Sequence, residues 1–559
     1  MKKNPSLKHE IHEKHEEVHE YASTPLCASW APLSLVLVTC LLAVLACARP
    51  DLAVDYGNVT PVGGGAGPAF AAETPASAPS AVGQIAPPSP VAPGLPTRTP
   101  RPTLDVARSP TPDPPRASLL DRQAVEAYTV QRNDTLNQIG ARYGVTAEQI
   151  AQANGLNVAD TLFVGQVLLI PLPDQAARGP ALKLLPDSAF VYGPGDADFN
   201  LEGFVQAQGG YLAAYAEDVP GVLLDGSGAT LTGAEIVRLV ATRYSVSPRL
   251  LLAVLEHQSG WVTNPTPDDN TLVYPLRRVE VLREGLMRQL SWAADQLNRG
   301  YYGWRAAWLV ALIFGDGGFR LIDPGLNAGT VGVQHFFAQL LTVEAWTRTT
   351  SAGGFDQTYR RLFGHPFRFA VEPLVPPGLV QPDLQLPFEP GRVWAFTGGP
   401  HGAYGSGSAW AAVDFAPPAD AEGCVTSDEW VTASAAGLVV RSEYGAVVLD
   451  LDGDGFEGTG WALFYFHIER RDRVAAGAFV AAGDRLGHPS CEGGISNGTH
   501  VHLARKYNGE WLSADGALPL ALDGWVAAGL GREYDGTFSR AGVSLEACDC
   551  RAPGNEISR

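Results

Sequence analysis

A proline-rich stretch near the N-terminus limits how this 559-residue chain can fold. Between residues 61 and 115, 15 of 55 residues are proline, and glycine, alanine, serine and threonine fill much of the remainder. A segment of this composition cannot bury a core, and it favours an extended spacer of about 3.1 Å per residue. We therefore expect residues 49–125 to be a disordered linker, with the folded domains on its C-terminal side.

Length and composition restrict the remainder of the chain. It is too long for one core, since single domains rarely exceed about 250 residues. A content of 45% hydrophobic and 18% charged residues is typical of globular proteins. The 59 acidic and 40 basic residues give a net charge of −19, which disfavours nucleic acid as a partner. We expect a multidomain protein with no nucleic-acid surface.

The N-terminus has the features of an export segment. Residues 31–48 carry no charge, and their length suits either a short membrane span or the apolar part of a signal peptide. Residues 1–30 are charged and include several lysines, which indicates a cytoplasmic side. The run Val44–Cys47 resembles a lipobox, in which a lipid-modified cysteine becomes the new N-terminus. Lipidation of Cys47, an uncleaved membrane anchor and plain secretion all remain open, and each places the later domains outside the cytoplasm.

A short module follows the linker at residues 126–172. Its pattern predicts a strand at 128–130, two amphipathic helices and a returning strand at 167–170. The whole stretch from 128 to 171 resembles the LysM domain. That resemblance implies a βααβ fold that binds N-acetylglucosamine-containing glycans such as peptidoglycan. Carried over from the family, the glycan groove involves Asp134, Thr135, Leu136, Gly155, Leu156 and Asn157.

The middle region, residues 180–385, is rich in helical patterns. The stretch 244–261 resembles the start of the lysozyme-like lytic transglycosylases, in which a helix ends in a catalytic glutamate directly before a serine. Gln258 occupies that position here and cannot act as a general acid. Glu256 lies roughly 200° around a helix from it, so it does not substitute. We expect a mostly α-helical lysozyme-like domain that is catalytically inactive and helps to position glycan.

The C-terminal region, residues 386–559, changes to glycine-rich, strand-like segments that predict an antiparallel sheet. Side chains with metal-binding or proton-transfer chemistry coincide in it: His401, Asp414, His467 and the pair His500 and His502. Because side chains alternate along a strand, the last two histidines project from the same face. With a third histidine and a carboxylate, such a pair can form a zinc site with an open position for water. Such a site activates water and polarises a carbonyl, as peptide hydrolysis requires.

This combination resembles the lysostaphin/LytM-type zinc endopeptidases, whose peptidase domain is all-β. Twelve residues separate His401 from Asp414, which is the spacing of the beta-lytic branch. The resemblance implies that zinc is bound by His401, Asp414 and His502. It also implies that His467 and His500 are catalytic, one as the general base and the other steadying the oxyanion. Which histidine has which role stays open.

Acidic residues at alternate positions suggest a second cation. Asp450, Asp452 and Asp454 resemble the first half of an EF-hand loop, but Trp461 stands where the loop would need its final glutamate. No flanking helices are evident, so this is not an EF-hand. We expect a hairpin loop, with Ca²⁺ as a candidate ligand.

The seven cysteines fall into two groups. Three lie in the first fifty residues, and four lie near the C-terminus: Cys424, Cys491, Cys548 and Cys550. The second group lies in the part expected outside the cytoplasm, where disulfides form. Four cysteines allow three pairings. We favour Cys424–Cys491, because Cys491 lies nine residues before His500 and can brace the strand of the metal site.

These features together predict an extracytoplasmic zinc endopeptidase that hydrolyses the peptide cross-bridges of peptidoglycan. LysM would target it to the cell wall, and the N-terminus would anchor it to the membrane directly or as a lipoprotein. The alternative is a non-catalytic wall-binding regulator that activates other peptidoglycan hydrolases, since some family members have lost zinc. A third class, a secreted protease acting on elastin-like proteins, is disfavoured by LysM.

Overall fold

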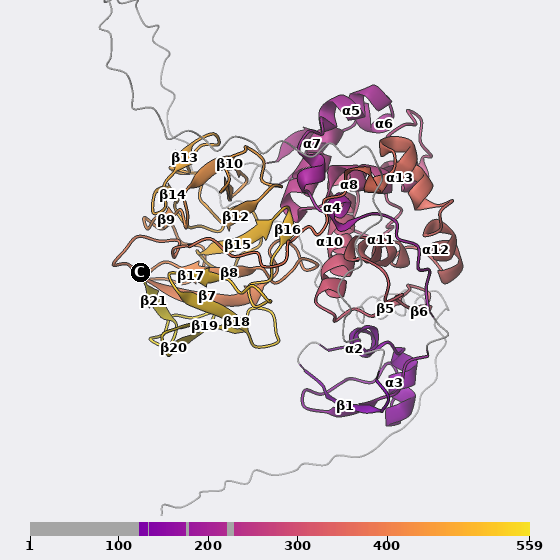
Figure 1. The fold of residues 1–559 in the computed structure, drawn as a ribbon, viewed down its shortest axis with the longest axis horizontal. Coiled ribbons are helices and arrows are strands. Elements are labelled where there is room, and N and C mark those ends of the chain that lie inside the picture. Colours follow the sequence, from indigo (N-terminus) through magenta and orange to yellow (C-terminus); the bar gives the residue numbers. More distant parts are fainter. Residues whose placement is uncertain (1–121, 132–133, 175–177, 221–227) are drawn as a thin grey trace, which may run out of the picture. The chain divides into compact units, whose positions relative to one another are not determined.

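The computed structural model describes residues 122–131, 134–174, 178–220 and 228–559 (Figure 1). The predictions for residues 1–30, residues 31–48, Cys47 and nearly all of the linker therefore lie outside the described residues. Within the described ranges, no helix combines the length and apolar character needed to cross a membrane.

The module at 126–172 has the expected order of elements: β1 (Glu126–Thr129), α2 (Leu136–Tyr143), α3 (Ala147–Asn154) and β2 (Val167–Ile170). The two strands pair antiparallel. Each helix begins with a threonine capping box, at Thr135 and Thr146, and ends at a glycine in the left-handed conformation. These caps fix both helices within a module whose apolar core is small.

The middle region is mostly helical, as expected. Its α-helices are α4 (Asp187–Phe190), α5 (Leu201–Gln208), α6 (Tyr211–Ala214), α7 (Gly233–Tyr244), α8 (Pro248–Ser259), α9 (Asn270–Val273), α10 (Leu286–Arg305), α11 (Ala328–Ala338), α12 (Val343–Thr349) and α13 (Phe355–Phe363). Two 3₁₀ turns are η3 (Pro194–Asp196) and η4 (Pro366–Phe369). Two antiparallel hairpins complete it: β3 (Ala216–Val219) with β4 (Ala229–Thr232), and β5 (Ala311–Ile313) with β6 (Phe319–Leu321).

Helices α10 and α11 form the closest helix pair of this region. Gly300 of α10 makes the approach possible, because a Cβ on it would lie 2.8 Å from the Cα of Gly332 in α11. Helix α8 is almost wholly apolar between Leu250 and Leu255, and that run is fully buried. A helix buried on all sides needs neighbours all round, which the surrounding helices supply.

The C-terminal region is built on a nine-stranded sheet in the order β13-β10-β11-β12-β15-β8-β7-β21, with β16 paired to β15. Its strands are β7 (Val393–His401), β8 (Ala412–Ala416), β10 (Gly437–Glu443), β11 (Ala446–Asp450), β12 (Trp461–Phe466), β13 (Phe479–Val480), β15 (Val501–Tyr507), β16 (Glu510–Trp511) and β21 (Glu556–Ser558). Smaller sheets contain β9 (Val431–Thr432) with β14 (Arg485–Gly487), and β17 (Ala521–Leu522), β18 (Trp525–Gly529), β19 (Gly536–Arg540) and β20 (Val543–Glu546). All of these pairings are antiparallel, as the sequence predicted.

The two faces of the large sheet pack against different partners. Val413 and Leu503 point into a core within the C-terminal region. Their strand neighbours Ala412 and Ala504 belong to a core that they share with the helices of the middle region. Phe464 lies in this same shared core. The helical region and the large sheet of the C-terminal region are therefore joined by one continuous apolar core.

Hydrogen bonds reinforce this joint along β16. Arg305 of α10 contacts the buried Glu510 carboxylate at 2.6 Å, and the Tyr301 hydroxyl donates to it at 3.2 Å. The backbone N–H of Trp511 donates to the Tyr302 hydroxyl at 3.0 Å. A buried carboxylate needs such partners, because an unpaired buried charge is strongly destabilising.

Replacing Arg305 with alanine should therefore destabilise the protein substantially. The change leaves Glu510 buried without its cation, and the loss of one partner from a buried pair costs about 3–5 kcal/mol. Chemical denaturation would measure the free energy of unfolding. The control is Arg348→Ala, whose partner Glu344 is exposed, and we expect a loss below about 1 kcal/mol there. Equal losses would contradict the structural role of Arg305.

A buried ionic cluster lies on the shared-core face of the sheet. The carboxylate of Glu457 accepts from Arg441 at 2.9 and 3.0 Å and from Lys506 at 2.8 Å. Burial alone would raise the pKa of Glu457, but the two cations outweigh burial and lower the pKa to about 2. The pKa thus lies below its unfolded value of about 4.3.

This lowered pKa makes stability depend on pH. The contribution of Glu457 is fully present above the unfolded pKa and is lost as pH falls toward 2, amounting to about 3 kcal/mol. We expect Glu457→Gln to flatten this part of the stability curve between pH 5 and pH 2, whereas Glu344→Gln, an exposed control, should not. Unfolding followed as a function of pH measures both, and parallel curves for Glu457→Gln and wild type would contradict the assignment.

Candidate metal centre

Three neighbouring strands bring the predicted ligands together. His401 ends β7, Asp414 lies in the middle of β8, and His502 is the second residue of β15. Asp414 has a partner on each neighbouring strand. His502 of β15 lies directly opposite it on one side, and Gly398 of β7 lies opposite it on the other. No side chain fits at Gly398, because a Cβ there would lie 2.5 Å from Asp414 Oδ2.

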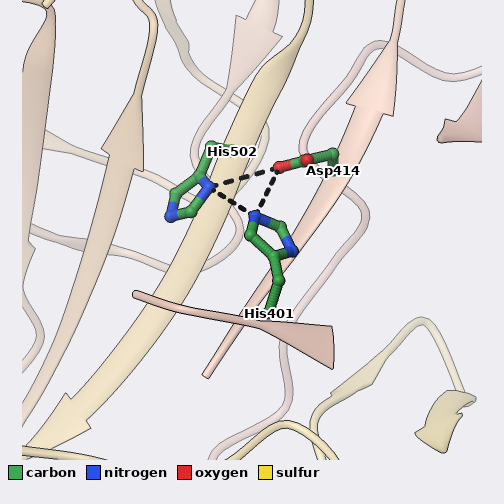
Figure 2. A group of neighbouring side chains, drawn as sticks. All are labelled: His401, Asp414 and His502. Atoms are coloured by element: carbon green, nitrogen blue, oxygen red, sulfur yellow. Dashed lines mark hydrogen bonds and ion pairs between the residues drawn. The ribbon is translucent and has the colours of Figure 1, made fainter. Parts of the chain in front are cut away.

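The ligand atoms converge on one point (Figure 2). His401 Nε2 lies 2.9 Å from His502 Nδ1, and Asp414 Oδ1 lies 3.3 Å and 3.2 Å from these two nitrogens. All three side chains are buried. Two imidazoles and one carboxylate thus present three ligand atoms to the same small space.

This donor set fits a zinc ion. Tetrahedral zinc with bonds of about 2.0–2.2 Å keeps its ligand atoms roughly 3.3–3.5 Å apart. The separations here are close to that range. Asp414 Oδ1 is buried and has no hydrogen-bond donor, which is costly unless a cation satisfies it. The residues present therefore match what zinc requires.

Backbone carbonyls orient both histidine ligands. His401 Nδ1 donates to the Gly399 carbonyl at 2.8 Å, and His502 Nε2 donates to the Ala403 carbonyl at 3.0 Å. Because a carbonyl oxygen only accepts, these nitrogens carry the protons. In the neutral ring, the lone pair is then on the opposite nitrogen, which faces Asp414, as metal ligation requires.

The two predicted catalytic histidines lie beside this group. The rings of His467 and His500 are 4.5 Å apart between centroids, and His500 Nε2 is 3.7 Å from Asp414 Oδ1. His467 Nδ1 donates to the Glu492 carbonyl at 2.9 Å, and His500 Nδ1 donates to the Gly498 carbonyl at 2.8 Å. In the neutral form of each ring, this contact leaves the lone pair on Nε2.

Burial and mutual charge set the ionisation of the site. Burial alone would raise the pKa of Asp414, but His401 and His500 outweigh it and hold the pKa well below its usual range. Burial alone would lower the pKa of His401, but Asp414 outweighs it and raises the pKa. For His467, burial and then the nearby histidines lower the pKa well below its ordinary value. The arrangement favours an anionic aspartate and a neutral His467.

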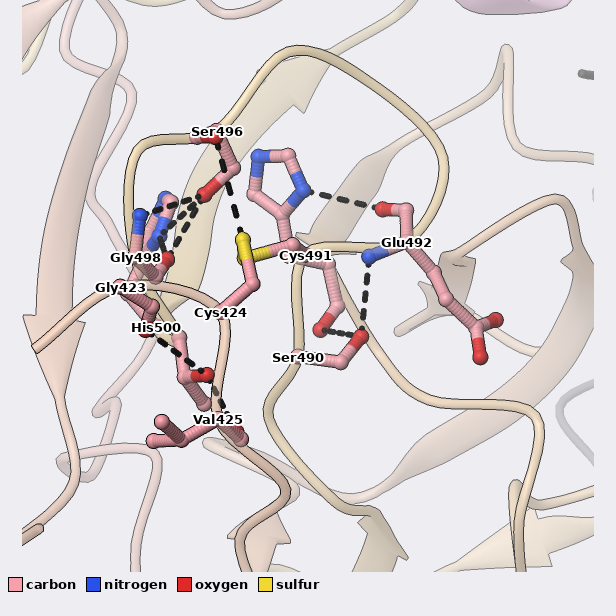
Figure 3. The surroundings of a disulfide bond; sticks show 11 residues. Gly423, Cys424, Val425, Ser490, Cys491, Glu492, Ser496, Gly498 and His500 are labelled. Carbon is pink, nitrogen blue, oxygen red and sulfur yellow. Dashed lines mark hydrogen bonds between the residues drawn. A yellow bond between two sulfur atoms is a disulfide. The ribbon is translucent and has the colours of Figure 1, made fainter. Parts of the chain in front are cut away.

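A disulfide braces the segments around these histidines (Figure 3). Cys424 and Cys491 are bonded, which is the pairing that the sequence favoured. Next to Cys491, the Ser490 N–H donates to the His467 carbonyl at 2.7 Å, and the Ser490 carbonyl accepts from the His500 N–H at 3.3 Å. The bond thus ties down the backbone that carries both predicted catalytic histidines. Cys548 and Cys550 form a second disulfide.

Removing the first disulfide should weaken both stability and activity. It spans 67 residues, so the double variant Cys424→Ser/Cys491→Ser should lose about 2–4 kcal/mol in free energy of unfolding. The rate of peptide hydrolysis should fall as well, because Ser490 would no longer be held in place. The matched control is Cys548→Ser/Cys550→Ser, which spans only two residues and should largely keep the rate. A normal rate in the first variant would contradict the bracing role.

Tyr534 is a site residue that the sequence did not reveal. Its ring stacks on His401 with centroids 4.2 Å apart and an angle of 20°. Its backbone pairs with β7, since the Gly399 N–H donates to the Tyr534 carbonyl at 2.8 Å. A single tyrosine in a loop between β18 and β19 carries no pattern that would have placed it here.

The predicted calcium ligands do lie together. Asp450 ends β11, and Asp452 and Asp454 lie in the expected loop between β11 and β12; the three residues have carboxylate oxygens within 4.8 Å of one another. Burial and then the neighbouring carboxylates raise the pKa of Asp452 to about 8. The Asp450 carboxylate accepts backbone N–H groups of the loop itself, including that of Gly455 at 2.8 Å. Calcium binding stays a prediction.

The predicted glycan groove of the N-terminal module also stays a prediction. Several of its residues serve the fold: Asp134 accepts from the Tyr128 hydroxyl at 2.7 Å, Thr135 caps α2, and Leu136 is buried. Gly155 ends α3, Leu156 packs against the core, and Asn157 donates to Asp160. The exposed Thr135, Gly155 and Asn157 are the members open to solvent.

In the middle region, the structure shows which groups the Glu256 and Gln258 side chains bind. Glu256 accepts from the N–H groups of Val262 and Thr263, both at 3.1 Å, and from Arg361 at 2.6 Å. Gln258 donates to the Leu276 carbonyl at 3.0 Å. Both side chains hold loops in place, and the catalytic inactivity of this region stays a prediction.

Comparison with known proteins matches two regions of the chain to known domains. Residues 128–171 match the LysM domain, and residues 183–376 match the model described as LasA, N-terminal domain. Protease LasA of Pseudomonas aeruginosa is 29% identical over 356 residues, which cover 60% of this chain and 76% of that protein. The amidase XlyA of Bacillus subtilis is 39% identical over 62 residues, covering 11% of this chain and 20% of that one.

Among solved structures, the M23 metalloprotease pseudoalterin from the deep sea shares 25% identity; the match covers 32% of this chain and 100% of that chain, with a TM-score of 0.27. The resemblance seen in the sequence is confirmed by the domain and relative matches, which support a LytM-type metalloendopeptidase with a LysM domain. This is a class of zinc endopeptidases. The matched LasA model covers most of residues 180–385, and the lysozyme-like character of that region stays a prediction.

Proposed function

We propose that this protein hydrolyses peptide cross-bridges of peptidoglycan outside the cytoplasm and is held to the cell wall by its LysM domain. One observation carries the proposal: His401 Nε2, Asp414 Oδ1 and His502 Nδ1 converge on one point, with His467 and His500 beside it. The relationship to protease LasA and the LysM match support the choice of substrate.

The chain's own residues prepare this site for zinc. His401, Asp414 and His502 are the proposed ligands, and the carbonyls of Gly399 and Ala403 fix which imidazole nitrogen faces Asp414. When bound, zinc polarises the scissile carbonyl and makes a water nucleophilic at neutral pH.

Proton transfer falls to the histidine pair. His467 and His500 each hold a proton on Nδ1 against a backbone carbonyl, so Nε2 is left as the reactive atom. One Nε2 would accept the proton of the attacking water, and the other ring, when protonated on Nε2 as well, would donate to the oxyanion and so steady it. Their ring separation of 4.5 Å allows both to reach the same substrate carbonyl.

The N-terminal segments would determine where in the cell envelope the enzyme acts. The LysM domain would bind N-acetylglucosamine-containing glycan, and the proline-rich linker would extend it and the peptidase away from the membrane. Anchoring through residues 31–48 or through a lipid on Cys47 belongs to this proposal.

Hydrolysis of purified peptidoglycan in a zymogram tests the proposal. Wild type should clear the gel, and chelation should abolish clearing until zinc is restored. His502→Ala should reduce clearing by at least about 100-fold, because a metal site that loses a ligand binds zinc poorly. The control His365→Ala, in the helical region, should clear normally.

The outcomes separate the alternatives. Equal clearing by wild type, chelated protein and His502→Ala would contradict a zinc mechanism. Binding to peptidoglycan without clearing by any of them would favour the non-catalytic regulator. Where wild type clears the gel, mass spectrometry of the released fragments would identify the bond that is cut.

A further inference from the structure

The loop between the first two proposed metal ligands touches the helical region. It runs from Gly402 to Ser408, and its tip rests on helix α10. We propose that Asp295 of α10 is a positioning residue for the metal centre: through this loop, it sets the carbonyl that orients His502. The inference rests on the proposed function, because it concerns the same zinc site.

The first step links His502 to the loop. His502 Nε2 donates to the Ala403 carbonyl at 3.0 Å, and this contact keeps Nδ1 aimed at Asp414. A partner of this kind fixes the tautomer and the ring orientation of a metal-binding histidine. The position of one loop carbonyl therefore determines how well His502 can bind metal.

The second step is the rigidity of the loop. The Ala403 N–H donates to the Ala409 carbonyl at 3.0 Å. The Tyr404 N–H donates to Ser408 Oγ at 3.1 Å, and that hydroxyl donates to the Gly405 carbonyl at 3.0 Å. Because the loop is closed on itself, a displacement at its tip moves Ala403 as well.

The third step is the anchor on α10. Asp295 Oδ1 accepts from the Gly407 N–H at 2.8 Å, and Oδ2 accepts from Ser406 Oγ at 3.2 Å. Arg299, one turn further along α10, donates to the same Ser406 hydroxyl at 3.0 Å. The two shortest side-chain hydrogen bonds of Asp295 thus go to the tip of the loop, and Gln296 Nε2 donates to Oδ2 at 3.4 Å.

Two glycines make this contact possible. Gly407 lies so close to α10 that a Cβ on it would be 2.0 Å from the Asp295 carbonyl oxygen. Gly405 has a φ of 75°, and a Cβ there would be 2.8 Å from Tyr244 of α7 and 2.9 Å from Asp295 Oδ1. The glycine-rich segment after β7 is therefore explained by close packing against the helical region.

An aromatic contact holds the same loop from the side. Tyr404 packs edge-on against Tyr244, with ring centroids 5.0 Å apart, and against Phe466 of β12 at 5.7 Å. Tyr244 is itself held, since its carbonyl accepts from Asn298 of α10 at 2.8 Å. Helices α7 and α10 thus both contact the loop: Tyr244 of α7 packs against Tyr404, and Asp295 of α10 makes the charged contact.

Zinc affinity and steady-state kinetics of the full chain test this role. Loss of a group that directly holds a metal-binding histidine costs about 10–100-fold in metal affinity, and Asp295 acts one step further out, so Asp295→Ala should raise the zinc dissociation constant about 3- to 10-fold. The value of kcat should fall while KM stays unchanged, since Asp295 does not touch substrate. Asp295→Asn keeps an acceptor for Gly407 and should restore most of the affinity.

A second variant and a matched control separate the effect of the loop's position from the effect of removing a charge. Gly407→Ala should raise the zinc dissociation constant as Asp295→Ala does, because it pushes the loop off α10 without changing a charge. The matched control is Asp316→Ala, whose carboxylate accepts a glycine N–H at 3.0 Å but within its own hairpin, and it should bind zinc normally.

The inference is overturned if Asp295→Ala and Gly407→Ala both bind zinc with wild-type affinity and keep the wild-type kcat while remaining folded. Lowered thermal stability with unchanged zinc affinity would likewise overturn it, since the role would then be merely structural. The proposed function fails in a different way, namely if the wild-type protein itself binds no zinc or if His502→Ala binds it equally well.

Discussion

The antiparallel pairing of β7, β8 and β15 is the constraint on which the proposed site depends. It sets His502 directly opposite Asp414 and brings the end of β7, with His401, alongside. A shift of one residue in either register would turn a ligand to the other face of the sheet, where the separate apolar core lies. Four backbone carbonyls then fix the four imidazoles, so the positions of the reactive nitrogens follow from the backbone.

The face of the sheet that carries the ligands is also the face that packs against the helical region. Ala412 and Ala504 lie two residues from Asp414 and His502, and both belong to the core shared with the helices. Two buried carboxylates on this face have cationic partners: Glu457 is paired with Arg441 and Lys506, and Glu510 with Arg305 of α10. The packing of the large sheet therefore depends on residues of the helical region.

Local patterns predicted much of the site and fold. The alternation of His500 and His502 along one strand, the two amphipathic helices of the LysM module and the strand character after residue 386 depend only on neighbouring residues. The choice of ligand set came from the family resemblance. Tyr534, Asp295 and Arg305 could not be predicted, because each acquires its role through contacts with residues far away in the sequence. Glu256 shows the same limit, since only the structure reveals that it holds a loop.

Crystallographic anomalous scattering at the zinc edge, on the full chain supplied with zinc, is the most direct test of the central claim. We predict one strong zinc peak bonded to His401 Nε2, Asp414 Oδ1 and His502 Nδ1, with the Ala403 carbonyl still accepting from His502. A zinc ion held by other residues, or no zinc while these three side chains stay in place, would contradict the account.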